Sequence, residues 1–378
     1  MSIDALFGSF SLSGLTLENR IIMAPMTRSL SPQGVPGDDV AAYYQRRAAG
    51  GTGLIVTEGT WIDHGMAGND ENVPRFHGED ALAGWRRVVD AVHAVGGKIV
   101  PQLWHVGQTT KPAIDSIFDT PARLYHPDVV GPSGMIGGIG TQMSLLGKPM
   151  TLDDIDAVIA SYARAARAAM ELGFDGIELH AGHGYLIDQF LWSETNLRVD
   201  AYGGGPASRA RFGAEVVAAI RAITRPDFPI FFRFSQWKSQ DYGACIASSP
   251  AELEAILRPL ADAGVDVFHA SQRRFWEPAF EGADLNLAGW AKAVTGKASI
   301  TVGSVGLDGD FLDSLTEGAP GATSLSGIRR LAEMIEKEEI DLVAVGRALL
   351  ADPQWPAKLH AGRTDMEPFS VEKLASLY

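Results

Sequence analysis

The chain has 378 residues, and 32 lysines and arginines against 46 aspartates and glutamates give a formal net charge of −14. Hydrophobic residues make up 46% of the chain, which is enough for a large core and excludes a disordered, collagen-like or coiled-coil protein. The acidic balance argues against a nucleic-acid partner, because binding to phosphates requires clustered lysine and arginine. The single cysteine, Cys245, excludes an intramolecular disulfide and any zinc or iron–sulfur site made of several cysteines.

The N-terminal residues lack the basic start and long apolar run of a signal peptide. No stretch approaches the roughly 18 uninterrupted apolar residues of a membrane span. We therefore expect a cytoplasmic protein with no membrane partner.

Short β-rich runs alternate with helical patterns from one end of the chain to the other. In chain order the expected elements are a strand over 20–26, a helix over 40–49, a strand over 54–57, a helix over 81–95, strands over 98–104 and 176–180 separated by a helix over 155–172, a helix over 208–223, a strand over 230–234, a helix over 250–263, and strands over 265–269, 299–302 and 342–345. Thr151 and Asp154 form the pattern of a capping box at the start of the 155–172 helix, and Gly173 ends it.

Eight strands, each with room for a following helix, match the number at which a parallel sheet closes into a (β/α)8 TIM barrel. An open doubly wound sheet would need a Gly-x-Gly-x-x-Gly turn after its first strand, and the turn here reads Pro25-Met-Thr-Arg-Ser29. We predict a barrel that forms one domain over residues 1–378. A long excursion over 105–150 follows the third strand. Its position at the strand's carboxyl end favours a lid over the active site, with a decorative loop as the alternative.

Polar residues, glycines and one tryptophan follow the predicted strands, where the active site of a barrel is built. They are Thr27, Gly59, Gln102, Trp104, His180, His183, Arg233, Ser271, Gly303, Ser304, Gly346 and Arg347. The set contains no carboxylate pair of the glycosidase kind and no Ser-His-Asp arrangement. The glycines after the seventh and eighth strands, with Arg347, predict a phosphate site, because glycine lets backbone N–H groups approach phosphate oxygens.

The two histidines of the segment His180-Ala-Gly-His183-Gly-Tyr185 have three possible interpretations. Two histidines could bind a metal with His105 or Glu178 as a third ligand, but nothing in the sequence fixes that ligand. They could be structural, or they could donate two hydrogen bonds to one carbonyl oxygen. A tyrosine hydroxyl ordinarily keeps its proton at neutral pH and can act as an acid. The third interpretation, with Tyr185 as proton donor, suits reduction of an activated C=C bond and is favoured.

Six segments resemble the Old Yellow Enzyme family of flavin-dependent ene-reductases. They are Leu15–Arg28, Pro101–Gly107, Glu178–Tyr185, Gln189–Leu191, Asn196–Gly204 and Val345–Arg347, in family order. The resemblance implies non-covalently bound FMN and a hydride donor that is NADPH or NADH. Thr27, where one branch carries cysteine, is similar to the threonine-type branch.

The resemblance also implies a role for each site residue. Pro25, Met26 and Thr27 would line the isoalloxazine ring, Gly59 and Gln102 would contact its pyrimidine edge, Arg233 would face the N1–C2 region, and Gly303, Ser304, Gly346 and Arg347 would hold the phosphate. His180 and His183 would bind the substrate carbonyl, and Tyr185 would protonate Cα. Trp104, Phe275 and Trp276 are further candidates for the substrate wall, although the last two could equally be rim packing. Asp188 stands where a histidine or asparagine is more usual in this family.

The sequence thus predicts an NAD(P)H-dependent reductase of small α,β-unsaturated carbonyl compounds, present as a monomer or homodimer. A flavin-free lyase or aldolase acting on a phosphorylated substrate is the alternative enzyme, but no lysine ends a predicted strand to form a Schiff base. A non-catalytic flavin-binding or storage protein is the third hypothesis for the function. It leaves His180, His183 and Tyr185 unexplained.

Overall fold

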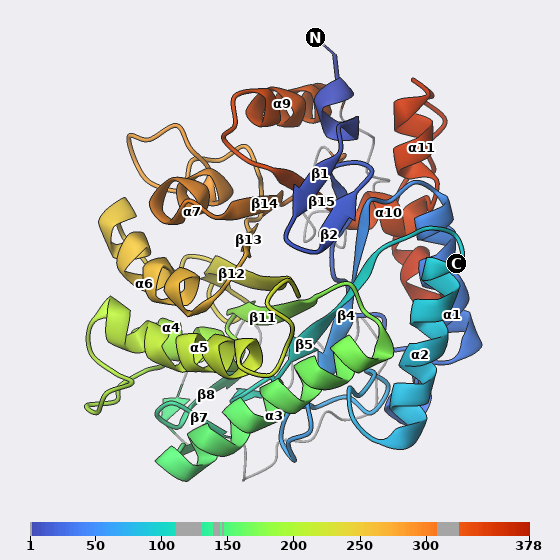
Figure 1. Cartoon of the computed structure of the whole chain (residues 1–378). Coiled ribbons are helices and arrows are strands. Elements are labelled where there is room, and N and C mark those ends of the chain that lie inside the picture. The colour runs from blue at the N-terminus through green and yellow to red at the C-terminus, as the bar shows by residue number, and fades with distance from the viewer. Residues whose placement is uncertain (1, 111–129, 139–143, 146, 308–324) are drawn as a thin grey trace.

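The computed structural model describes residues 2–110, 130–138, 144–145, 147–307 and 325–378 (Figure 1). Eight parallel strands form a closed barrel, as predicted. They are β3 (Ile21–Met23), β4 (Leu54–Trp61), β5 (Ile99–Trp104), β11 (Ile177–His183), β12 (Ile230–Lys238), β13 (Val267–Ser271), β14 (Ala298–Val302) and β15 (Leu342–Val345). The last strand, β15, pairs with the first, β3, and this pairing closes the ring.

Helices surround the barrel on its outside (Figure 1). They are α1 (Asp38–Ala49), α2 (Glu79–His93), α3 (Leu152–Leu172), α4 (Leu186–Leu191), α5 (Pro206–Arg221), α6 (Pro250–Ala263), α7 (Leu287–Thr295), α9 (Leu325–Glu336), α10 (Arg347–Ala351) and α11 (Trp355–His360), with short 3-10 helices η1 (Asp4–Phe7), η2 (Pro32–Gly34) and η3 (Val371–Ala375). The arrangement is a (β/α)8 barrel. Within the described part of the chain, no helix combines the length and apolar character needed to cross a bilayer.

The ends of α3 follow from its sequence. Thr151 Oγ1 accepts the backbone N–H of Asp154, and the Asp154 carboxylate accepts the backbone N–H of Thr151. This reciprocal pair satisfies two N–H groups that the first turn of a helix leaves without partners. Gly173 ends the helix in the left-handed region at φ 86°, where a residue without a Cβ is favoured. Both predicted boundary signals are confirmed.

A β-hairpin fills the amino-terminal end of the barrel. Its strands, β1 (Phe10–Leu12) and β2 (Leu15–Leu17), pair in antiparallel register. The buried Leu15 and Leu17 join one apolar cluster with barrel residues that include Phe231 and Leu342. A ligand cavity is therefore built at the opposite end, where the strands terminate.

The excursion after the third barrel strand is confirmed, since β5 ends at Trp104 and α3 begins at Leu152. Its described parts include the short strands β6 (Thr109–Thr110), β7 (Val130–Gly131), β8 (Met135–Gly138), β9 (Ser144–Leu145) and β10 (Lys148–Pro149). Residues 111–129, 139–143 and 146 lie outside the described residues. None of the described residues between 105 and 150 lines the central cavity, and the lid stays a prediction.

Candidate active site

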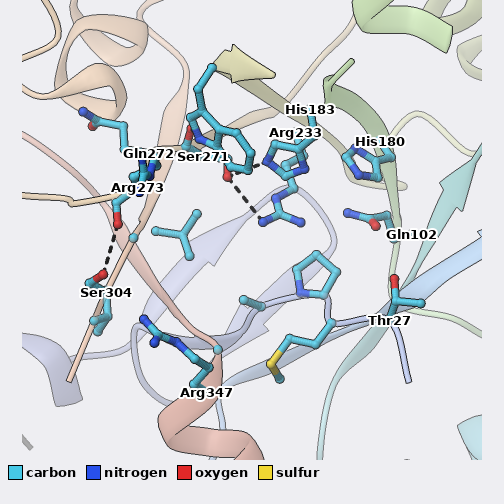
Figure 2. A pocket seen from close by; sticks show the side chains of 18 of the residues that line it. Thr27, Gln102, His180, His183, Arg233, Ser271, Gln272, Arg273, Ser304 and Arg347 are labelled. Atoms are coloured by element: carbon cyan, nitrogen blue, oxygen red, sulfur yellow. Dashed lines mark hydrogen bonds between the residues drawn. The ribbon is translucent and has the colours of Figure 1, made fainter. Parts of the chain in front are cut away.

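A cavity of about 410 Å³ opens at the carboxyl ends of the barrel strands (Figure 2). Its volume lies in the range typical of small-molecule and cofactor sites. It brings together most of the site residues predicted from the sequence: Pro25, Met26, Thr27, Gln102, Trp104, His180, His183, Tyr185, Arg233, Gly303, Ser304, Gly346 and Arg347. Pro25 and Arg347, 322 positions apart in the chain, thus line one cavity, because a closed parallel barrel places the carboxyl ends of all its strands on one face.

Three predicted residues do not line this cavity. Gly59 lies beneath the Trp104 indole, and a Cβ at this position would come within 2.4 Å of the indole Cε3. Phe275 is buried, and its ring centroid lies 5.2 Å from that of Trp276. This pair lines a second, smaller cavity together with Arg330. The structure therefore places Gly59 as support for Trp104, and it places Phe275 and Trp276 outside the lining of the central cavity, in a neighbouring cavity that shares Ser304 with it.

The Tyr185 ring packs edge to face against two other rings on one wall of the central cavity. The Tyr185 ring centroid lies 4.7 Å from that of Trp104 and 4.9 Å from that of His180. Tyr185 directly precedes α4, which begins at Leu186, and Trp104 is the last residue of β5. Edge-to-face contact at these distances is a favourable geometry for aromatic rings. The packing holds Tyr185 beside His180.

His183 is held in an unusual backbone conformation at the end of β11. Its φ is 63°, a value that non-glycine residues rarely adopt, and Gly184 follows at 84°. The His183 Nε2 atom lies 2.8 Å from Ser271 Oγ, and its backbone N–H donates to Ser235 Oγ. The Trp237 ring stacks on the imidazole at a centroid distance of 4.4 Å. Left-handed residues of this kind concentrate at functional sites.

Both histidines are neutral at physiological pH. Burial lowers the pKa of His180 and of His183 well below the ordinary value of 6.5, and the nearby Arg233 charge lowers both further. A neutral imidazole carries one N–H donor. The Nδ1 atom of His180 is buried and has no hydrogen-bond partner among the described residues. A ligand that accepts a hydrogen bond would satisfy this ring.

Gln102 presents its amide in a defined orientation. Its Nε2 donates to Glu178 Oε1 over 2.8 Å, and the other oxygen of Glu178 lies 2.6 Å from His269 Nδ1. Because the amide nitrogen is occupied by a carboxylate, the amide oxygen is left as an acceptor for a ligand N–H group. His269 was not singled out from the sequence, although a histidine within an otherwise apolar strand is a usable signal.

Arg233 supplies charge to the cavity. Its side chain is 8% exposed, Nη2 donates to Ser271 Oγ at 3.4 Å, and Nε has no partner among the described residues. Burial lowers the pKa of the guanidinium, while the Glu178 carboxylate opposes that shift. Among the described residues, the cavity lining contains Arg233, Arg273 and Arg347 but no acidic residue, in a chain of net charge −14. Such a site favours an anionic or electron-rich ligand.

Backbone rather than side-chain bulk shapes one end of the cavity. Gly303 adopts φ 142°, and a Cβ there would come within 2.5 Å of the Gln272 carbonyl oxygen. Ser304 also has a positive φ, and its hydroxyl donates to the Arg273 carbonyl oxygen. Ser304 and Arg347 lie on one side of the cavity, whereas Thr27, Gln102 and His180 lie on the other (Figure 2). The cavity therefore has a small-residue, cationic end and a hydrogen-bonding, aromatic end.

Some lining residues lay outside the predicted set. Trp237 and Tyr242 come from β12 and the loop after it, and the Arg273 guanidinium lies 4.6 Å from the Tyr242 ring centroid. The segment Phe234-Ser-Gln-Trp-Lys238 contains polar and charged residues within a strand, which was the available signal. Leu374, from η3, also lines the cavity, and no feature of the sequence indicated it.

The chain is similar to flavin oxidoreductases over nearly its whole length. The sequence profile of the NADH:flavin oxidoreductase / NADH oxidase family matches residues 5–366. An NADH oxidase of Thermoanaerobacter brockii is 34% identical over 95% of this chain, which spans 51% of that longer protein. The flavin oxidoreductase hxnT of Emericella nidulans is 30% identical, over 95% of this chain and 91% of its own length.

Solved structures show the same architecture. Morphinone reductase superimposes with a TM-score of 0.77 at 28% identity, covering 98% of this chain and 92% of its own. A second structure of that enzyme is in complex with tetrahydroNAD and has a TM-score of 0.73.

Proposed function

The chain belongs to the NADH:flavin oxidoreductase / NADH oxidase family, that of the Old Yellow Enzymes, and on that premise we propose that it is an FMN-dependent, NAD(P)H-driven reductase of α,β-unsaturated carbonyl compounds. The observation that carries the proposal is the division of the central cavity. One end would suit a phosphate, and the other end, which His180, His183 and Tyr185 line, would suit a ring and a carbonyl group.

The residues of the cavity fit FMN. At the cationic end Gly303, Ser304, Gly346 and Arg347 would hold the phosphate. At the other end the Gln102 amide oxygen would accept the ring N–H. The Nε atom of Arg233, which has no hydrogen-bond partner among the described residues, would face the electron-rich side of the ring. Pro25, Met26 and Thr27 also line the cavity and would contact the ring. When bound, FMN would supply the redox chemistry for hydride transfer from NADPH or NADH to Cβ of the substrate.

His180, His183 and Tyr185, at the aromatic end of the cavity, would bind and protonate the substrate. His180 and His183 would each donate one N–H to the substrate carbonyl oxygen, where negative charge develops during hydride addition. Loss of one such donor costs about 3–4 kcal/mol of transition-state stabilisation in well-studied enzymes. The Tyr185 hydroxyl would give its proton to Cα. Contact with Trp104 and His180 holds the tyrosine ring at this position.

Thr27 lies in the cavity lining at the position that separates the branches of the family. We assign the chain to the threonine-type branch on this residue. A threonine hydroxyl near the ring carbonyl can donate a hydrogen bond there and so influence the reduction potential. A monomer or homodimer remains the expected assembly.

The test is the visible absorption spectrum of the desalted protein under anaerobic conditions, followed through addition of NADPH and then of 2-cyclohexenone. We expect a flavin band that bleaches with NADPH and returns with the enone. Cyclohexanone, which has the carbonyl but lacks the C=C bond, is the matched control and should leave the bleached band unchanged. A protein that stays colourless after incubation with FMN would overturn the proposal and favour a phosphate-binding lyase.

A further inference from the structure

A fully buried ion pair lies directly behind the histidine–tyrosine segment. Lys238 Nζ, near the end of β12, donates to Asp188 Oδ1 of α4 over 2.7 Å, and both side chains are 0% exposed. Lys238 Nζ also donates to the Ser235 carbonyl oxygen at 3.0 Å. Neither residue lines the central cavity. The reductase chemistry described above does not use either of them.

The second carboxylate oxygen of the pair reaches the turn that carries His183 and Tyr185. Asp188 Oδ2 accepts the backbone N–H of Gly184 over 2.7 Å. Gly184 has φ 84°, and a Cβ there would come within 2.0 Å of Gln240 Oε1. The pair is thus anchored to the residue between the histidine and the tyrosine.

The Lys238 side of the pair reaches His183 through the backbone. His183 and Lys238 are opposite each other in the β11–β12 register, and the His183 carbonyl oxygen accepts the backbone N–H of Ser239. Ser235, whose carbonyl oxygen is bonded to Lys238, accepts the His183 backbone N–H through its hydroxyl. Two consecutive left-handed residues are therefore held by contacts that converge on one ion pair.

The charged pair has a function at this position that an apolar pair could not have. Burial raises the pKa of Asp188 and lowers the pKa of Lys238, and each partner opposes the shift in the other. An apolar pair of similar volume often stabilises a core as well as a buried ion pair does. An apolar pair could not accept the Gly184 N–H, however, and hydrogen bonds to a carboxylate are stronger than those to neutral acceptors.

We propose that Asp188 and Lys238 are positioning residues, which hold the His183–Gly184 turn in its left-handed conformation and so direct His183 and Tyr185 into the substrate end of the cavity. Asp188 binds the turn, and Lys238 keeps Asp188 ionised and oriented. The inference rests on the proposed function for its catalytic consequence. Its structural part, the restraint of Gly184, stands on the contacts alone.

The experiment compares two double variants and one single variant of the flavin-loaded protein with the wild type. Asp188→Leu/Lys238→Met removes both charges and the acceptor for Gly184. Asp188→Asn/Lys238→Met removes the charges but keeps an amide oxygen that can accept the same N–H. Lys292→Met is the control, because it breaks a partly buried ion pair with Asp341 at 2.9 Å, before the start of β15 and remote from the cavity.

Two measurements are made on each variant. Hydrogen–deuterium exchange of peptides that contain Gly184 reports the turn, and titration with 4-hydroxybenzaldehyde reports the substrate end through its absorbance change with the flavin. For Asp188→Leu/Lys238→Met we expect about tenfold faster exchange at Gly184 and about tenfold weaker binding of the phenol, with unchanged flavin content. In Asp188→Asn/Lys238→Met the exchange rate and the phenol affinity should both lie within about threefold of the wild-type values. Lys292→Met should change neither quantity.

Unchanged exchange and unchanged phenol affinity in a folded, flavin-loaded Asp188→Leu/Lys238→Met protein would overturn the inference. Equal losses in the Asn/Met and Leu/Met variants would also overturn it, since the acceptor would then be irrelevant. If the wild-type protein holds flavin but binds no phenol, the substrate assignment of the proposed function fails, while exchange at Gly184 still decides this inference.

Discussion

The buried carboxyl group of Glu58, close to the cavity, makes the free energy of unfolding depend on pH. It lies in β4, is 2% exposed, and its Oε2 accepts the backbone N–H groups of Arg28 and Ser29, the two residues after Thr27. Burial raises the pKa of Glu58 from an ordinary 4.5 to about 7; the two N–H groups and the Arg28 charge oppose the shift, and Asp70 adds slightly to it. We predict that Glu58→Gln removes this dependence, because an amide oxygen can accept the same two N–H groups without a charge.

The size of the effect follows from the two pKa values. Below pH 4.5 the folded and unfolded chains both hold the proton, and the stabilising contribution is complete. Between pH 4.5 and about 7 only the unfolded chain releases it, so stability falls as pH rises. Above pH 7 the loss approaches its full value of roughly 3 kcal/mol, of which about 2 kcal/mol falls between pH 5.5 and 8.

The assay is urea unfolding of the wild type and of Glu58→Gln, followed by tryptophan fluorescence at several pH values from 5.5 to 8. The free energy of unfolding of the variant relative to wild type should rise by about 2 kcal/mol over this range. Glu71→Gln, the same chemical change at an exposed position, is the control and should show no such trend. A constant difference between wild type and Glu58→Gln across the range would refute the reasoning.

Two further predictions concern the substrate end of the cavity. His180→Ala should weaken binding of a phenol by roughly 10- to 150-fold, the value of one hydrogen bond to a charged ligand, while flavin content stays the same; unchanged phenol affinity in an absorbance titration would remove His180 from carbonyl binding. Tyr185→Phe should slow reoxidation of the reduced enzyme by 2-cyclohexenone by about 10²- to 10⁴-fold, the usual contribution of a general acid, and leave reduction by NADPH close to wild type. Stopped-flow measurement of both half-reactions checks this, and equal slowing of the two would show that Tyr185 is not the acid.

The eight strands and five of the outer helices, α1, α2, α3, α5 and α6, could be predicted because their signals are local. Apolar runs, a capping box at Thr151 and a terminal glycine at Gly173 each act within a few residues. The count of strand–helix units then allows only a few arrangements, and the closed barrel is one of them. Closure also predicts a shared face, which is why Gln102, Arg233 and Arg347 could be grouped before any contact was known.

The residues that support the site could not be predicted in the same way. Phe275 and Trp276 follow β13 as site residues should, yet they pack into a separate cavity, because loop geometry and not chain position decides where their rings point. Leu374 reaches the central cavity from η3, far from any strand end.

The sequence by itself determined the barrel, the family and the chemical types of the site residues, since periodicity, turn residues and short motifs are properties of neighbouring positions. Only the tertiary structure decided what surrounds each group. It placed Gln102 against Glu178, buried Glu58 beneath the loop after Thr27, and joined Asp188 to Lys238 behind Gly184. The physical reason is that burial, pKa and hydrogen-bond partners depend on atoms brought together from distant parts of the chain.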